Sequence, residues 1–164
     1  MADGKTPAVF FDRDGTIMHD VNYCSDPKDM HVFPFVAGSL RKLKAHGFKL
    51  IMITNQSGIG RGYFTREQYS AVHAEVLRQL GEPLIDATYV CPDVPGVESK
   101  CRKPAPGMIL QGAGEHSVDL SRSIMIGVAS TNKDKQTLVD WGFRLVEYHK
   151  MPEYRAIHER AAAD

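Results

Sequence analysis

Short apolar runs alternate along this chain with stretches whose apolar residues recur at helical spacing, and this alternation restricts the fold more than any other feature. The runs predict buried strands, and the stretches between them predict amphipathic helices. Strands that alternate with helices favour a parallel sheet with helices on both faces. We therefore expect an α/β fold, a three-layer Rossmann-like sheet, with strands over residues 8–11, 49–54, 87–90, 123–126 and 144–146.

The predicted helices carry recognisable start and end signals. Val36, Leu40 and Leu43 share one face of a helix that ends before Gly47. Thr65 begins a capping box, and the apolar stripe after it predicts a helix that reaches residue 80. Further helices are predicted over 106–116, 134–141 and 152–163.

Composition narrows the class of protein. With 164 residues, the chain fits one domain spanning 1–164. Twenty basic residues balance twenty acidic ones, so no net field would attract nucleic acid or an anionic membrane. The sequence has no apolar run long enough to span a bilayer and no secretory signal. We expect a cytoplasmic monomer whose partner is a small molecule.

The strand over 8–11 ends in Asp12-Arg13-Asp14-Gly15-Thr16. Two carboxylates two residues apart at a strand end repel each other, and a bound divalent cation would remove that cost. Gly15 permits the tight turn that points backbone N–H groups inward. An acidic turn that merely caps the strand is the alternative interpretation of this segment.

The strand over 49–54 ends in Thr54-Asn55-Gln56-Ser57 and continues into the glycine-rich run 58–62. A hydroxyl, an amide and a loop that lets the backbone approach closely suit a phosphate group. Lys103, in the run Cys-Arg-Lys-Pro, could neutralise both a nucleophilic carboxylate and a phosphoryl group at the same sheet edge. A flexible surface loop and a solvated lysine are the alternatives.

The three motifs DRDGT, ITNQSGIGRGYFT and CRKPAPGM, in this order, resemble the haloacid dehalogenase-like (HAD) phosphatases. The similarity runs over residues 7–148 and is strongest to the capless group that contains heptose bisphosphate and histidinol phosphatases. The resemblance implies a HAD-like fold without a cap domain. It also implies Mg²⁺-dependent hydrolysis of a phosphomonoester in carbohydrate metabolism.

The resemblance also implies residue roles. Asp12 would attack phosphorus to form an aspartyl-phosphate, and Asp14 would protonate the leaving alcohol and then activate water. Thr54 and Lys103 would hold the phosphoryl oxygens. The residues expected to contact the rest of the substrate are Asn55, Ser57, Arg61 and Arg102.

The expected magnesium site departs from the family pattern. Mg²⁺ would lie between Asp12, the backbone carbonyl of Asp14 and an acid after the strand over 123–126. Val128 stands where that acid belongs, and valine cannot bind a hard cation that takes oxygen ligands. Asp134 matches the place of the second acid if the loop carries a two-residue insertion. Water, Ser130 or Asp134 could replace the missing ligand, with Asp134 the residue that we assign to the metal, and we expect metal affinity to be reduced.

The cysteines suggest neither a disulfide framework nor a zinc site. The chain has three, Cys24, Cys91 and Cys101, an odd and sparse set. Members of the group that this chain resembles carry a zinc-binding loop with four ligands. In this chain Asp93 and Ser99 stand in place of two of those ligands. Two thiols make a poor zinc site, so we expect little zinc.

Two functions remain open on the sequence. The first is an active phosphatase on a sugar phosphate such as a heptose phosphate, with histidinol phosphate as the alternative substrate. The second is a weakly active or inactive relative that binds phosphorylated ligands or a partner, which Val128 favours. Transfer of the phosphoryl group to an alcohol instead of water is a minor third option.

Overall fold

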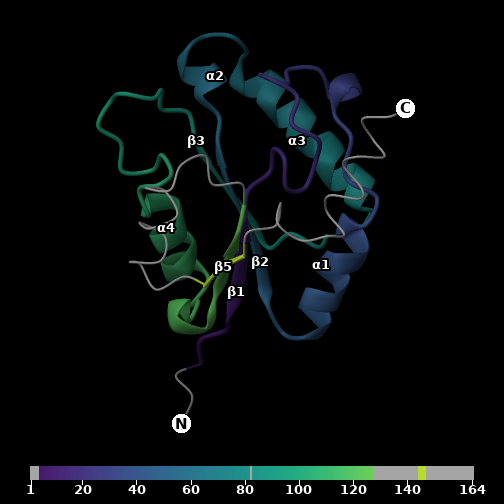
Figure 1. The fold of residues 1–164 in the computed structure, drawn as a ribbon, viewed down its shortest axis with the longest axis vertical. Coiled ribbons are helices and arrows are strands. Elements are labelled where there is room, and N and C mark those ends of the chain that lie inside the picture. Colours follow the sequence, from purple (N-terminus) through teal and green to yellow (C-terminus); the bar gives the residue numbers. More distant parts are fainter. Residues whose placement is uncertain (1–3, 82, 128–143, 147–164) are drawn as a thin grey trace.

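The computed structural model describes residues 4–81, 83–127 and 144–146 (Figure 1). It contains a parallel sheet of five strands in the order β3-β2-β1-β4-β5. The strands are β1 (Ala8–Phe11), β2 (Lys49–Asn55), β3 (Ala87–Cys91), β4 (Ile124–Ile126) and β5 (Arg144–Val146). All five predicted strands are therefore confirmed, with boundaries within one residue.

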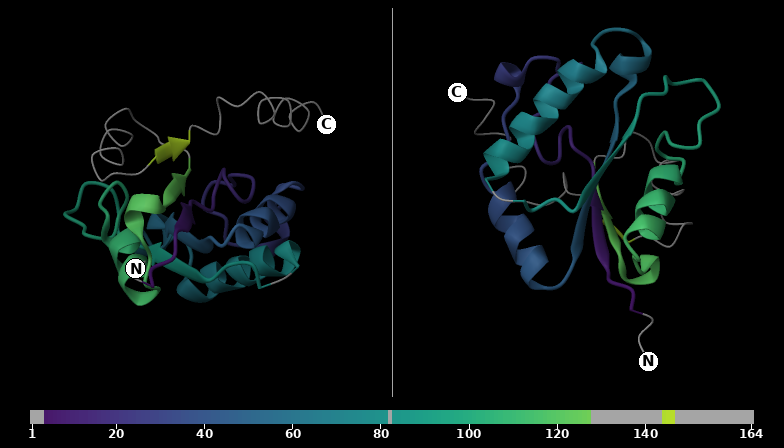
Figure 2. Two further views of the ribbon diagram at one scale, coloured as in Figure 1. Left: turned by 90° about the horizontal axis from the view of Figure 1, so that it is seen from below. Right: turned by 180° about the vertical axis from the view of Figure 1, so that it is seen from behind.

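Helices cover both faces of the sheet, as predicted (Figures 1 and 2). Helices α1 (Val36–Ala45) and α3 (Arg66–Leu80) lie on one face, and α4 (Gly107–Glu115) lies on the other. The helical elements that remain are α2 (Ser57–Gly60) and the 3₁₀ turns η1 (Pro27–Asp29) and η2 (Leu120–Arg122). The three-layer α/β fold is thus confirmed.

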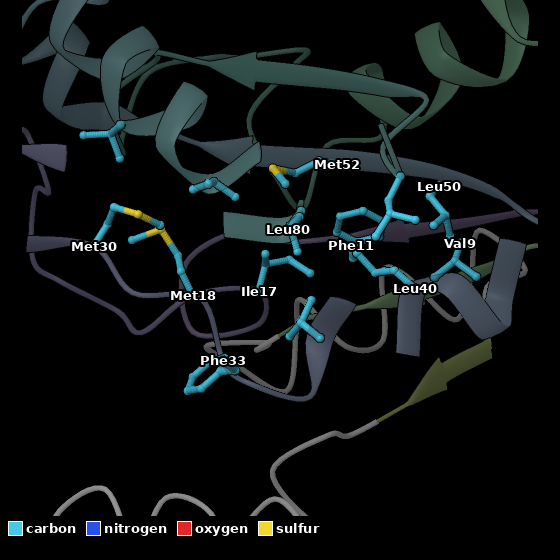
Figure 3. Packing of buried hydrophobic residues seen from close by; sticks show 14 of the residues in the cluster. Val9, Phe11, Ile17, Met18, Met30, Phe33, Leu40, Leu50, Met52 and Leu80 are labelled. Atoms are coloured by element: carbon cyan, nitrogen blue, oxygen red, sulfur yellow. The ribbon is translucent and has the colours of Figure 1, made fainter. Parts of the chain in front are cut away.

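The side chains of β1 show why the sheet is buried on both sides. Val9 and Phe11 point into the core shared with α1 and α3, which Figure 3 shows, while Ala8 and Phe10 point into the core under α4. All four are at most 1% exposed. A continuous apolar run is what a central parallel strand requires, because neither face meets water.

The predicted helix ends are also observed. Helix α1 is followed by Gly47, whose φ of 82° is in the left-handed region that favours glycine. Thr65 accepts a hydrogen bond from the backbone N–H of Gln68, whose side chain accepts one from the backbone N–H of Thr65. This reciprocal capping box starts α3.

The described residues contain no inserted cap between the strands. Residues 12–35 and 92–106 form loops, with η1 as the one short helical turn in them. Within the described part of the chain, no helix is long and apolar enough to cross a membrane. The helices predicted over 134–141 and 152–163 lie outside the described residues.

Two leucines of α3 provide a stability test of this packing. Leu80 is 1% exposed, whereas Leu77 is 38% exposed on the same helix. We expect Leu80→Ala to lower the free energy of unfolding by about 3 kcal/mol, because it leaves a cavity against β1 and β2. Leu77→Ala is the matched control and should cost less than about 1 kcal/mol. Chemical denaturation measures both, and equal losses would contradict the packing described here.

Candidate active site

The carboxyl ends of four strands meet at one edge of the sheet, and the four predicted catalytic residues lie together at that edge. Asp12 comes after β1, and its backbone N–H donates to the carbonyl of Ile126 at the end of β4 (3.0 Å). A Cβ atom added to Gly127 would lie 3.4 Å from Cβ of Asp12. The backbone N–H of Gln56, after β2, donates to the carbonyl of Cys91 at the end of β3 (2.7 Å). Parallel pairing therefore brings these distant segments together.

Asp12 forms an ion pair with Lys103. The lysine Nζ lies 2.8 Å from Oδ1 of Asp12 and donates a second hydrogen bond to the carbonyl of Ile53 (3.0 Å). The backbone N–H of Arg13 also donates to Oδ1 (2.8 Å). One oxygen of Asp12 is thus held by two donors, and among the described residues none donates to the other oxygen, Oδ2.

Asn55 places Lys103 at this position. Its Oδ1 accepts from the backbone N–H of Lys103 (3.0 Å), and its Nδ2 donates to the backbone carbonyl of the same residue (3.2 Å). The amide therefore joins the end of β2 to the loop before α4. Asn55 also lines the cavity next to Asp12 and Asp14 that is described below, and we expected Asn55 to contact substrate.

Asp14 accepts hydrogen bonds from three side chains. Arg13 donates from Nε to Oδ2 (3.2 Å) and from Nη2 to Oδ1 (3.0 Å). Gln56 donates from Nε2 to Oδ2 (2.8 Å), and the hydroxyl of Thr54 lies 3.4 Å from the same oxygen. Neither Arg13 nor Gln56 was predicted to serve the site, although both stand inside motifs that the sequence analysis singled out.

A cavity of about 380 Å³ opens above Asp12 and Asp14. Asp20, which the sequence analysis missed, also lines it, and burial raises the pKa of Asp20, with further contributions from the charges of Asp14 and Asp12. No strand-end or helical periodicity marks Asp20 in the sequence, so only the fold of the loop identifies it. The remaining lining residues are Val21, Asn22, Tyr23, Cys24, Asn55, Gln56, Ser57 and Gly58.

Two glycines of the glycine-rich run are required by close packing, which the interpretation of this run as a phosphate-binding loop did not predict. A Cβ atom at Gly58 would collide with the ring of Phe64, and one at Gly60 would collide with the carbonyl oxygen of Pro92. Close approach of these groups therefore requires glycine at both positions. Gly58 lines the cavity as well, so the same residue serves packing and the site.

The predicted substrate-binding residues separate into two groups. Ser57 and Asn55 line the cavity. Arg61 is exposed and is not among the lining residues. Arg102 donates from Nη1 to the carbonyl of Asp93 (3.0 Å), which ties its guanidinium to the loop after β3. Their proposed contacts with substrate remain predictions.

Asp134 and Val128 lie outside the described residues, so the predicted third metal ligand is not placed. The described groups nevertheless fit a hard cation. Among these residues, neither Oδ2 of Asp12 nor the backbone carbonyl of Asp14 accepts a hydrogen bond from the protein. Both are oxygen donors of the kind that Mg²⁺ prefers, at a site where three carboxylates gather.

The structure corrects the interpretation of the cysteines. Cys91 and Cys101 form a disulfide with their Cα atoms 5.5 Å apart, whereas Cys24 is a free, buried thiol. The sequence count missed this bond because it tested for a framework of several bridges rather than for one local pair. Asp93 and both sulfurs lie within 4.8 Å of one another. A disulfide leaves no thiolate to bind zinc, and the expectation of little zinc remains a prediction.

Comparisons with known proteins show which family the chain matches. The model of the polynucleotide kinase 3 phosphatase family matches residues 7–148. D-glycero-beta-D-manno-heptose-1,7-bisphosphate 7-phosphatase from Helicobacter pylori (strain J99) is 42% identical over 124 residues, which cover 73% of this chain and 71% of that protein. The enzyme of the same name from Yersinia pestis is 38% identical over 132 residues, 75% of this chain and 70% of its own.

A solved structure shows the same fold. The D,D-heptose 1,7-bisphosphate phosphatase from B. bronchiseptica, complexed with magnesium and phosphate, matches with a TM-score of 0.71 and 28% identity. The match covers 85% of this chain and 78% of that protein.

The disulfide and the zinc expectation can be tested together. We expect alkylation of the denatured, unreduced protein to label one cysteine, Cys24, and alkylation after reduction to label all three. Elemental analysis of the same unreduced sample should find less than one zinc per chain. In Cys91→Ser, two cysteines should be labelled without reduction. Three labelled cysteines together with one bound zinc in the natural protein would contradict both expectations.

Proposed function

The chain belongs to the polynucleotide kinase 3 phosphatase family of HAD-like phosphatases, and we propose that it hydrolyses the phosphomonoester of a small sugar phosphate, a heptose phosphate, through an aspartyl-phosphate. The arrangement around Asp12 carries this proposal. Asp12 and Asp14 line the same cavity, and Lys103 pairs with Asp12. A nucleophile, a second carboxylate and a fixed cation are the parts that phosphoryl transfer requires.

The proposed steps follow from the positions of these groups. In the first step an oxygen of Asp12 bonds to phosphorus while the ester bond breaks, and Asp14 gives its proton to the departing alkoxide. In the second step Asp14 takes a proton from water, which displaces Asp12 and releases inorganic phosphate. Lys103 stays beside Asp12 and the phosphoryl oxygens in both steps, and Thr54 donates to those oxygens.

Asp12, the backbone carbonyl of Asp14 and Asp134 would hold Mg²⁺. The cation would neutralise the charge of the phosphoryl group when it is bound. The relative from B. bronchiseptica is complexed with magnesium and phosphate, which supports this choice of metal.

The cavity lining supports a hydroxyl-rich substrate. Asp20, Asn22, Asn55 and Ser57 present carboxylate, amide and hydroxyl groups that can hydrogen-bond a polyol. The names of the relatives point to a heptose bisphosphate as the first compound to test. Histidinol phosphate is the alternative, because the lining also contains a carboxylate, Asp20, that could bind its imidazole.

A screen of phosphate release tests the proposal. Heptose 1,7-bisphosphate, simpler sugar phosphates and histidinol phosphate are each incubated with the full chain, with and without Mg²⁺. We expect Mg²⁺-dependent release that is fastest with a sugar phosphate. No release from any compound would favour the second function, an inactive relative that binds phosphorylated ligands, for which Val128 is the motivating residue.

Asp12→Asn tests the covalent step. The amide is nearly isosteric with the carboxylate but is a poor nucleophile, so we expect turnover to fall at least about a hundredfold while the thermal transition remains cooperative. Asp119→Asn, a remote cap of η2, is the control and should retain activity. Retention of a tenth or more of the natural rate in Asp12→Asn would show that the assigned nucleophile is wrong.

The metal loop generates a second prediction. Because Val128 replaces a carboxylate of the family pattern, we expect Mg²⁺ to saturate activity only at about millimolar concentration. Val128→Asp should lower the half-saturating concentration about tenfold or more, and Asp134→Ala should abolish most activity. Phosphate release against Mg²⁺ concentration for the three proteins is the measurement. A low half-saturating Mg²⁺ concentration in the natural chain that Asp134→Ala leaves unchanged would exclude Asp134 as a ligand.

A further inference from the structure

Arg13 is a buried cation to which the proposed steps assign no role. Its side chain is 1% exposed, and its guanidinium carbon lies 5.2 Å from the centre of the Tyr69 ring. Removing a guanidinium from water is costly unless its hydrogen bonds are well formed. Two of its nitrogens, Nε and Nη2, donate to Asp14, one to each carboxylate oxygen, whereas the third, Nη1, is buried without a hydrogen-bond partner among the described residues.

The two hydrogen bonds from Arg13 fix the orientation of the Asp14 carboxylate in addition to offsetting its charge. A fork of two N–H groups on two oxygens holds the carboxylate in the plane of the guanidinium, so Asp14 cannot rotate about its terminal bond without losing both hydrogen bonds. The aromatic ring of Tyr69 beside Arg13 limits how far the guanidinium itself can move. Asp14 is therefore oriented from inside the protein, on the side away from solvent.

Gln56, the residue directly after β2, donates to the same carboxylate. It is 7% exposed, and its backbone is held by the carbonyl of Cys91. Its amide nitrogen donates to Oδ2 of Asp14 and to Oγ1 of Thr54, each at 2.8 Å. A carboxylate only accepts hydrogen bonds, so the nitrogen and not the oxygen of this amide must face Asp14. The hydroxyl of Thr54 accepts from Gln56, which leaves its own proton for Asp14 or for a phosphoryl oxygen.

The two oxygens of Asp14 consequently differ. Oδ2 accepts from Arg13 and Gln56, with Thr54 nearby, whereas Oδ1 accepts only from Arg13 among the described residues. We propose that Arg13 and Gln56 are positioning residues that occupy Oδ2 and turn Oδ1 toward the cavity, so that Oδ1 exchanges the proton with the leaving alcohol and with water. The proposal rests on the proposed function, since it assigns the geometry that the two steps need.

A comparison of two substrates with different leaving groups distinguishes the misplacement of Asp14 from a general loss of structure. A sugar alkoxide must be protonated as it departs, whereas p-nitrophenolate departs without a proton. The second step needs Asp14 as a base for either substrate, because water attacks the same aspartyl-phosphate. Misplacing Asp14 should therefore slow both steps with a sugar phosphate, but only the second step with p-nitrophenyl phosphate.

The decisive variant is Gln56→Leu, which removes the amide and keeps the bulk. With a sugar phosphate we expect kcat to fall about 10- to 100-fold and KM to change by less than about threefold. On rapid mixing with p-nitrophenyl phosphate and Mg²⁺, the variant should release a burst approaching one p-nitrophenolate per chain, larger than that of the natural protein. The size of the burst measures the aspartyl-phosphate that forms at the normal rate and is then hydrolysed slowly.

Two further variants keep the test independent of folding. Gln79→Leu is the matched control, because Gln79 is a half-buried amide that accepts from the backbone N–H of Val32. Its hydrogen bonds within the described part of the chain go to Val32, Met30 and Glu75, none of which lines the cavity. It should lower the melting temperature without changing kcat or the burst. Arg13→Lys keeps the buried charge but loses the fork, and should reproduce the kinetics of Gln56→Leu.

The outcomes are distinct. An unchanged kcat in Gln56→Leu, or equal losses on both substrates without a larger burst, would overturn the inference while leaving the proposed function intact. Absence of turnover in the natural chain with every substrate would overturn the proposed function and this inference with it.

Discussion

Mutual repulsion between Asp12 and Asp14, two residues apart at the end of a fully buried strand, is the constraint on which the rest of the site depends. Negative charge shared by two carboxylates in such a place is costly unless nearby cations offset it. The structure supplies a separate cation for each. Lys103 reaches Asp12 from the loop before α4, and Arg13 reaches Asp14 from within the same motif.

These two cations do not balance the site once a substrate arrives. Asp20 adds a third carboxylate, whose pKa is raised first by burial and then by Asp14 and Asp12. A phosphoryl dianion would bring further negative charge into the same cavity. A divalent cation held by oxygen donors is the physically reasonable way to offset this excess, which is why the proposed reaction depends on Mg²⁺.

The placement of Lys103 shows how the fold serves this charge balance. The lysine follows β2 by nearly fifty residues, yet Asn55 holds its backbone from both sides and Ile53 accepts from its ammonium group. The disulfide between Cys91 and Cys101 joins the end of β3 to the residue two positions before Lys103. The position of the cation therefore depends on contacts among three segments that are distant in the sequence.

The amino-acid sequence by itself determined the α/β architecture, because strand and helix periods are local properties that residues such as Phe10, Phe11 and Val76 carry in their spacing. It also indicated that Asp12, Asp14 and Thr54 lie together, since polar groups at the ends of buried parallel strands must meet at one edge of the sheet. Lys103 was singled out by its motif alone. Only the tertiary structure decided that Asn55 holds Lys103, that Gly60 is required by the carbonyl of Pro92, and that Cys91 pairs with Cys101. Likewise, only the fold brought Asp20 to the cavity and Arg13 and Gln56 to the carboxylate of Asp14. The physical reason is that hydrogen bonds and close contacts between distant segments depend on distances and directions in space, which no spacing of residues along the chain specifies.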